Sequence, residues 1–487
     1  MGRLPDVSQR YPEVRAREEE WISDLQRWVR QRTISNTGEG LEEGAGYLAR
    51  YLEEVGFDSV TIVPIGRTRW GQEAAPVVVG RMDAGAAKTL LVYMMYDTMP
   101  AGDERAWIAP PFEGRIMSAF GFDAVLLGRG AVNSKGPQAA FLSALKVLRK
   151  HGALPVNIVL VAEGDEERMS IGIQEFVARH ADMVRAADAA LMVMIQTRSG
   201  TARPAFGSEG CLYVELETSG RAWGRGPTEH DIHGIFKRQV DSPAWRHIHM
   251  LSTITADHGN TVLIEGWRDD LEPPSAEDLR RLDAVLPYMD TESIKQATKV
   301  RRFINDLEGR ELLRRSLYEP TFNLDGIWGG LTTPGTAGSI VPHRLVSKHN
   351  CRYYANQRGD RLLHLLRAHL DRHGYSDVEV RVIGDVDWLK PRYDTEIADA
   401  VFAMYRESGV PYLLLPAPGL IAMAPYWPAA ALGKPPLSLP VASGGLGYGA
   451  HQHAPNEYFV IRGDDRVCGL VEAVLGHILI LERYGGG

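Results

Sequence analysis

The sequence is poor in cysteine, in long apolar runs and in blocks of one charge. Its 487 residues include three cysteines, Cys211, Cys351 and Cys468, none in C-x-x-C spacing, so a disulfide framework or a thiolate metal site is not expected. No stretch reaches about 18 uninterrupted apolar residues, and the N-terminus has no apolar core of the signal-peptide type. These absences predict a soluble, cytoplasmic protein without a membrane partner.

Charge of both signs is spread along the chain. The sequence contains 54 Lys and Arg against 62 Asp and Glu, a formal net charge of -8. Without a Lys/Arg block to follow a phosphate backbone, nucleic acid is not an expected partner. The apolar content of 44% is enough for two hydrophobic cores, one in a large domain and one in a smaller domain.

Hydrophobic periodicity predicts an α/β arrangement in the first part of the chain. Residues 13–32, 41–54 and 137–150 have apolar side chains at helical spacing, whereas 89–95 and 157–162 are near-continuous apolar runs. Such runs are typical of strands that are buried on both faces. Strands that alternate with helices favour a largely parallel sheet flanked by helices.

The pattern changes after residue 207. Segments 211–220 and 344–354 alternate apolar and polar residues, as half-buried antiparallel strands do. A helix over 360–373 and a strand over 377–382 follow, and 394–408 is again helical. We therefore predict a discontinuous main domain over 1–207 and 388–487 that carries an inserted α+β domain over 208–387.

Polar side chains gather where the predicted strands end. The apolar strand in VLVAEGDEERMS (159–170) ends in an acidic cluster that contains Glu166 and Glu167. The carboxyl edge of a parallel sheet is where α/β proteins place their chemistry. Three further segments also place polar residues beside apolar ones: LVYMMYDTMP (91–100), GRGAVNSKGP (128–137) and GAHQHAPNEYF (449–459).

Together these segments resemble the co-catalytic zinc exopeptidases, the family of aminoacylases, carboxypeptidase G, carnosine dipeptidases and succinyl-diaminopimelate desuccinylase. The resemblance covers nearly the whole chain. It implies that the main domain is catalytic and that the insertion is a lid through which two copies form a homodimer.

Several positions that hold metal in this family carry other residues here. Met95 stands in place of a histidine, Asn133 in place of a bridging aspartate and Met194 in place of a second aspartate. Glu167 and His453 match metal ligands that are retained. Because thioethers hold zinc poorly, we expect at most one Zn, Mn or Co ion, bound by Glu167, His453 and Asn133, and no second metal site.

Other matched positions imply roles in catalysis and substrate binding. Glu166 matches the general base, and Asp97 follows the lost histidine. His233 matches a lid histidine that stabilises an oxyanion in the partner's active site. Arg352 matches an arginine that binds a substrate carboxylate, which predicts a small-molecule carboxylate substrate.

Some of these assignments stay open on the sequence alone. A carboxylate within the lid could pair with Arg352, and His451 or Asp165 could replace a lost metal ligand. Met95 and Met194 are most simply core residues.

Three functional hypotheses follow. The first is metal-assisted hydrolysis of an amide bond in an acylated amino acid or dipeptide-like compound. The second is a metal-free enzyme in which Asp97, Glu166 and Glu167 crowd together and one pKa rises; it would carry out acyl transfer, cyclisation, deamination or amide formation in a specialised pathway. The third is a non-catalytic binding protein, against which the retained Glu166 counts.

Overall fold

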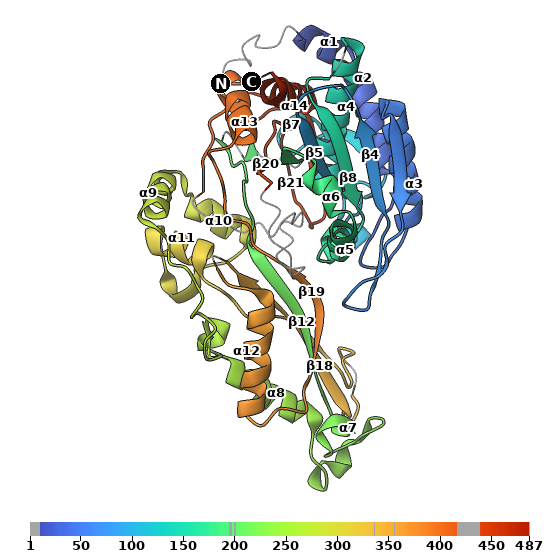
Figure 1. The fold of residues 1–487 in the computed structure, drawn as a ribbon. Coiled ribbons are helices and arrows are strands. Elements are labelled where there is room, and N and C mark those ends of the chain that lie inside the picture. Colours follow the sequence, from blue (N-terminus) through green and yellow to red (C-terminus); the bar gives the residue numbers. More distant parts are fainter. Residues whose placement is uncertain are drawn as a thin grey trace. The chain divides into compact units, whose positions relative to one another are not determined.

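The computed structural model describes residues 10–486 except 153, 194–196, 199–200, 336, 355 and 416–438. These residues form two compact units, each with its own hydrophobic core (Figure 1). The first unit comprises the chain up to Gly207, Lys390–Leu415 and the described residues after 438, and the second is Ser208–Leu389. Among the described helices, none combines the length and apolar character needed to span a bilayer.

The first unit is built on a six-stranded sheet. Its order is β1 (Ser59–Val63), β4 (Val77–Met82), β8 (Asn157–Glu163), β5 (Thr89–Met95), β9 (Ala189–Met192) and β20 (Val441–Ser443). The pairs β8–β5, β5–β9 and β9–β20 are parallel, while β1–β4 and β4–β8 are antiparallel. The prediction of a largely parallel sheet is therefore confirmed.

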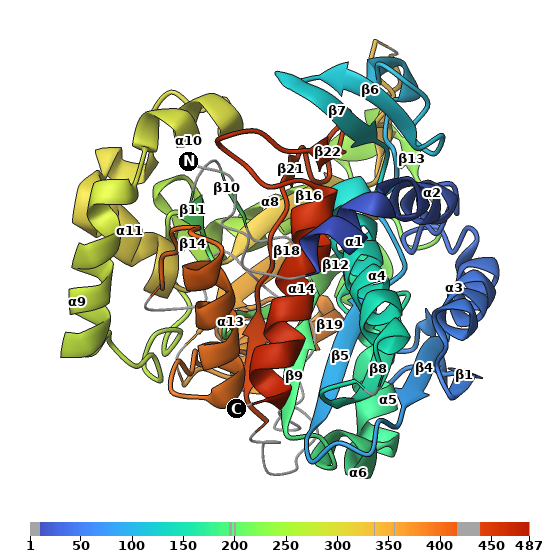
Figure 2. The same cartoon turned by 90° about the horizontal axis from the view of Figure 1, so that it is seen from above.

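Helices cover this sheet, namely α1 (Tyr11–Ala16), α2 (Glu18–Val29), α3 (Leu41–Val55), α4 (Gly136–Lys150), α5 (Ile171–Arg179), α6 (Ala181–Arg185), α13 (Glu396–Glu407) and α14 (Leu470–Gly485). Helices α4, α13 and α14 pack side by side (Figure 2). The helix predicted over 13–32 is two helices that meet at Arg17, where Trp21 Nε1 donates to the Val14 carbonyl at 3.0 Å.

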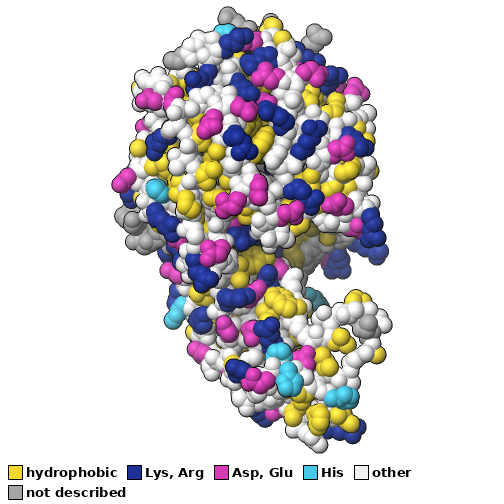
Figure 3. Space-filling view, turned by 90° about the vertical axis from the view of Figure 1, so that its right-hand side faces the viewer, with side chains coloured by type: hydrophobic (Ala, Val, Ile, Leu, Met, Phe, Trp, Pro, Cys, Tyr) yellow, Lys and Arg dark blue, Asp and Glu magenta, His cyan; other side chains and the backbone are white. Residues whose placement is uncertain are grey.

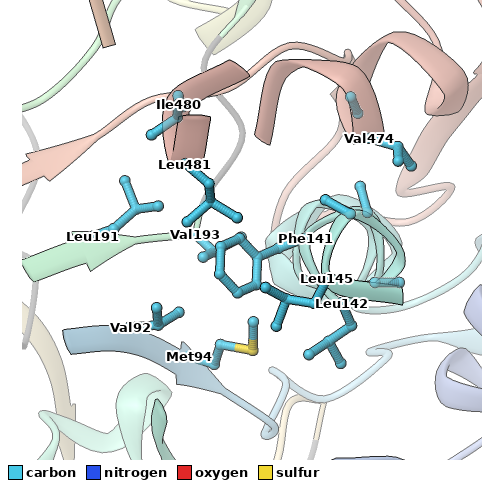
Figure 4. Packing of buried hydrophobic residues seen from close by; sticks show 14 of the residues in the cluster. Val92, Met94, Phe141, Leu142, Leu145, Leu191, Val193, Val474, Ile480 and Leu481 are labelled. Atoms are coloured by element: carbon cyan, nitrogen blue, oxygen red, sulfur yellow. The ribbon is translucent and has the colours of Figure 1, made fainter. Parts of the chain in front are cut away.

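The core lies between α4, α14 and the central strands. Pro137 in the first turn of α4 suits a helix start, because its missing N–H has no partner there in any case. Phe141 and Leu145 of α4 point toward Val92 and Met94 of β5 (Figure 4). Both helix and strand are apolar on nearly every side because neighbours cover them all round.

A second, antiparallel sheet in the same unit has the order β21 (Gly449–Ala450), β22 (Tyr458–Arg462), β7 (Phe122–Leu127) and β6 (Arg115–Ala119). Strands β22 and β7 are neighbours, with Tyr458 opposite Leu127. This register brings the segment after β7 next to the segment before β22, although more than 300 residues separate them in sequence.

The second unit contains an antiparallel sheet of order β16 (Asn323–Trp328), β18 (Arg344–Tyr353), β12 (Gly210–Ser219) and β19 (Glu379–Val386), with α8 (Pro243–Ile254) and α12 (Gly359–Arg372) packed on it. The antiparallel strand predicted here is confirmed as β12. Its alternation is incomplete, because Tyr213, Glu217 and Ser219 are partly exposed whereas Glu215 on the same face is buried. Glu215 lies between Lys348 and Arg381, whose long side chains cover the polar face of this central strand. On the face shown in Figure 3, acidic and basic side chains are interspersed.

Candidate active site

The carboxyl ends of β5 and β8 lie side by side. Met95 at the end of β5 pairs with Glu163 at the end of β8. The next polar residues of the two segments are therefore neighbours, and the Asp97 carboxylate accepts hydrogen bonds from the backbone N–H groups of Glu166 and Glu167 at 3.3 and 3.0 Å. This arrangement fixes the acidic turn against the end of β5.

Three of the residues predicted to bind metal are in mutual contact. Asn133 Nδ2 donates to Glu167 Oε1 at 2.7 Å, and His453 Nε2 lies 3.0 Å from the same oxygen and 3.0 Å from Asn133 Nδ2. The hydrogen bond to Glu167 raises the pKa of His453. When Nε2 carries a hydrogen it donates to the Glu167 carboxylate, and the Asn133 Nδ2 beside it, itself a donor, then makes no hydrogen bond to the ring. We call Asn133, Glu167 and His453 the ligand trio.

Burial and mutual repulsion raise the pKa values of the carboxyls beside the trio. Burial, followed by the Glu167 charge, raises the pKa of Asp97 to about 7. Burial, followed by the charges of Glu167 and Asp97, raises the pKa of Glu166 well above its ordinary value. Like charges at this spacing cannot all ionise together, so the cluster contains at least one carboxyl able to give and take a proton near neutral pH.

Glu163 forms the buried floor of this cluster. Its Oε1 accepts hydrogen bonds from Tyr93 Oη at 2.6 Å and Ser170 Oγ at 2.8 Å, and burial raises its pKa well above the ordinary value. Glu163 Oε2 has no partner among the described residues. A protonated Glu163 is consistent with this environment, since it would bury no charge.

The two candidate replacement ligands have other partners. Asp165 forms an ion pair with Arg168 at 2.6 Å and accepts from the Ala75 N–H at 2.7 Å. His451 Nδ1 lies 3.1 Å from the Asn456 carbonyl oxygen, and its ring packs against Phe120.

Of the two methionines that stand at positions matched to metal ligands of the family, the structure describes one. Met95 is 2% exposed and lies in β5, in keeping with a core residue. Met194 falls outside the described residues.

The trio offers a cation three ligand side chains and little charge. Catalytic zinc sites have three protein ligands, and the trio also offers three: a carboxylate oxygen, an imidazole nitrogen and an amide. Together these supply only one negative charge. The trio contains two residues of the His, Cys, Asp and Glu class, and no group of three or more such residues suited to a metal occurs in the part of the chain described. An ion would also require the Asn133 amide to turn its oxygen inward, because an amide N–H₂ cannot coordinate.

The predicted lid residues belong to the second unit. His233 lies at the end of β13 (Ile232–His233), is exposed, and its Nδ1 accepts from the Ile235 N–H at 3.1 Å. Arg352 in β18 donates to Glu209 Oε1 at 3.1 Å. The alternative in which Arg352 pairs with a lid carboxylate is therefore what the structure contains, and burial raises the pKa of Glu209 to about 7.

Two residues near the trio were not anticipated from the sequence. Arg129 and Glu457 form an ion pair at 2.6 Å and are 2% and 1% exposed by side chain. Arg129 lies in GRGAVNSKG and Glu457 in HAPNE, next to buried strands. A charged side chain in such a place needs a partner of opposite charge, and this was the signal from which the ion pair could have been predicted.

Comparison with known proteins identifies relatives of the whole chain. The chain is 28% identical over 338 residues to the Cys-Gly metallodipeptidase DUG1 of Candida albicans, covering 67% of each sequence. It is 26% identical over 282 residues to the human Beta-Ala-His dipeptidase, covering 57% of this chain and 52% of that protein. The structure of the M20 family metallo-carboxypeptidase Sso-CP2 from Sulfolobus solfataricus superposes with a TM-score of 0.81 at 26% identity, over 96% of this chain and 100% of that one.

The sequence model of Peptidase family M20/M25/M40 matches residues 91–475, which include the ends of β5 and β8 and all three members of the trio. The resemblance found in the sequence is confirmed, and the chain belongs to Peptidase family M20/M25/M40, a family of hydrolases that act on peptide C–N bonds.

Proposed function

We propose that this chain hydrolyses the amide bond of a small carboxylate-bearing substrate, an acylated amino acid or a dipeptide-like compound, with at most one metal ion. The observation that carries this proposal is the convergence of Glu167 Oε1, His453 Nε2 and the Asn133 amide within 3.0 Å, next to a Glu166 whose pKa is raised by burial. The dipeptidase activity named for two relatives supports the substrate class.

Glu167, His453 and Asn133 would hold the ion, which could be Zn, Mn or Co and would polarise the substrate carbonyl when bound. Glu166 takes a proton from the attacking water and returns it to the leaving amine nitrogen. Asp97 keeps Glu166 in place through the hydrogen bonds that it accepts from the backbone of the acidic turn.

The second unit is proposed to act as the lid. Arg352 would exchange Glu209, its partner in the structure, for the substrate carboxylate, and His233 would stabilise the oxyanion, in a homodimer formed through this unit. Support for the dimer comes from β16, a strand at the edge of its sheet that exposes Leu324, Ile327 and Trp328. An edge strand with exposed apolar side chains is a surface that proteins normally cover.

The test is hydrolysis of a dipeptide panel by the wild-type chain and by Glu166→Gln, which removes proton transfer with little change of shape. We expect kcat to fall by about 10²–10⁴ in this variant. Glu175→Gln is the matched control, because Glu175 is a carboxylate of the same unit that pairs with Arg69 outside the site. Equal activity in wild type and Glu166→Gln would refute the assignment of the base.

A second candidate is a metal-free enzyme on the same scaffold, favoured by the pKa of about 7 at Asp97 and by the single negative charge that the trio offers a cation. Asp97, Glu166 and Glu167 would then shuttle the proton in acyl transfer, cyclisation, deamination or amide formation. Activity that is unchanged after removal of all bound metal would favour this candidate over the first.

A further inference from the structure

Beneath the ligand trio, a buried carboxylate accepts four hydrogen bonds. Glu457 Oε2 accepts from Arg129 Nη1 at 2.6 Å and from the Gly130 N–H at 3.0 Å. Its Oε1 accepts from the backbone N–H groups of Val132 at 3.0 Å and Asn133 at 2.9 Å. Every donor belongs to the segment that follows β7, so one side chain determines the path of the loop that carries Asn133.

The same carboxylate is tied to the segment that carries His453. Glu457 lies four residues after His453, and Arg129 Nη2 donates to the carbonyl oxygen of Ala454 at 3.4 Å. The Glu457 carbonyl also accepts from the Gly128 N–H at 2.9 Å. The ion pair therefore joins the Asn133 loop to the His453 loop in both directions.

Arg129 extends this connection to the segment after β5. Its Nε donates to the Pro100 carbonyl oxygen at 3.2 Å, and its guanidinium lies 5.3 Å from the centre of the Trp107 ring. Asn456 reaches the same segment, since its side chain accepts from the Ile108 N–H at 2.7 Å. Three of the four segments that bring polar residues to the active site thus meet at one ion pair, and the acidic turn after β8 is the fourth.

A contribution to folding stability does not by itself explain the buried ion pair of Arg129 and Glu457. The cost of removing two charges from water is comparable to the gain from their attraction, and well-packed apolar residues often serve equally well. What an apolar pair could not do is to accept hydrogen bonds from a guanidinium and from three backbone N–H groups of the same loop.

We propose that Glu457, held by Arg129, is the positioning residue that sets the Asn133 amide and the His453 ring against Glu167. Glu457 touches neither the trio's side chains nor a substrate in this arrangement, and it acts through the backbone of the two loops. The proposal rests on the proposed function only for its expected effect on the rate of hydrolysis. The arrangement of the trio can be measured spectroscopically even if the chain has no hydrolytic activity.

The decisive variant is Glu457→Gln. A glutamine has the same shape, but its N–H₂ group would replace one of the two carboxylate oxygens. At either oxygen position it would face two N–H donors, so the Asn133 loop has to move. Asp24→Asn is the matched control: Asp24 is a buried carboxylate of the same unit, paired with Lys146 at 2.6 Å and with Arg27 at 2.5 Å, and it contacts no residue of the site.

The measurement is a ¹H–¹⁵N correlation spectrum of the histidine rings of the full-length chain, with His453 assigned through His453→Gln. We expect the His453 ring signals of Glu457→Gln to move as they do in Glu167→Gln, and those of Asp24→Asn to stay in place. In dipeptide hydrolysis, kcat should fall by about tenfold or more, as for other residues that orient ligands, with little change in KM.

His453 signals that remain at their wild-type positions in Glu457→Gln would overturn the proposal, even if the melting temperature falls as much as in Asp24→Asn. Should Glu457→Gln not fold, Arg129→Lys keeps the charge but cannot reach both Pro100 and Ala454, and the same shift is expected. If the wild-type chain hydrolyses no dipeptide, the proposed function fails, while the ring signals still decide the role of Glu457.

Discussion

Mild acid should loosen the second unit, because a chain of hydrogen bonds in its core requires two neutral histidines. His349 Nδ1 lies 3.0 Å from the carbonyl oxygen of Asn323, which can only accept. His349 Nε2 must then accept from Ser347 Oγ at 2.7 Å, so that Ser347 in turn accepts from His247 Nε2 at 2.8 Å. His247 Nδ1 is left to accept from Thr218 Oγ1 at 2.9 Å. An added proton on either ring would make that ring nitrogen a donor, so the neighbouring hydroxyl would have to accept instead and its own hydrogen would lose its acceptor.

The pKa shifts of the two rings give the size of the effect. Burial lowers the pKa of His247 from 6.5 to about 4, with the neighbouring His349 adding to the shift, and burial lowers the pKa of His349 to about 4. The unfolded chain therefore binds more protons below pH 6.5, and stability falls as the pH drops from 6.5 toward 4. The loss is about 2 kcal/mol per ring at pH 5 and about 3 kcal/mol below pH 4.

Hydrogen exchange read by mass spectrometry on peptides from β12 and β18 tests this expectation at pH 7 and pH 5, after correction for the intrinsic exchange rate. Protection of these strands should fall at pH 5, and His349→Asn, which cannot take up a proton, should show a smaller fall. His364→Asn is the control, since His364 is exposed on α12. Equal protection of β18 at both pH values would refute the reasoning.

Three further outcomes follow from the structure. Phe141→Ala removes a fully buried ring from the core and should lower the free energy of unfolding by about 3–5 kcal/mol in urea denaturation, whereas Ile62→Ala at an exposed site should change it little. Zinc at about 100 times its dissociation constant should stabilise the wild type by about 2.7 kcal/mol, seen as a higher melting temperature; the same gain in His453→Ala would contradict the assigned ligand. Trp328→Asp should shift the chain from dimer to monomer in analytical ultracentrifugation, and an unchanged sedimentation coefficient would exclude β16 from the interface.

Much of the fold could be predicted because its elements have simple apolar patterns. The runs at 89–95 and 157–162 are apolar at nearly every position since their strands, β5 and β8, are buried on both faces. Strand β12 could be predicted from its alternation, but the burial of Glu215 could not. Glu215 lies under Lys348 and Arg381 of the neighbouring strands, and a single-strand pattern contains no information about those neighbours.

The site was accessible from the sequence only in part. The motifs placed Asn133, Glu167 and His453 together, and the structure brings these side chains into contact; their roles remain predictions. The pairing of Arg129 with Glu457 could not be read from the motifs, because it joins residues 328 positions apart through the register of β7 and β22.

Metal content, measured by mass spectrometry on protein purified without an affinity tag or chelator, tests the central claim most directly when it is paired with a dipeptide hydrolysis assay. A single-ion hydrolase should retain about one equivalent of Zn, Mn or Co, lose it in His453→Ala and lose hydrolysis with it. About two equivalents per chain, or full hydrolysis by protein that binds no metal after challenge with all three ions, would contradict the account.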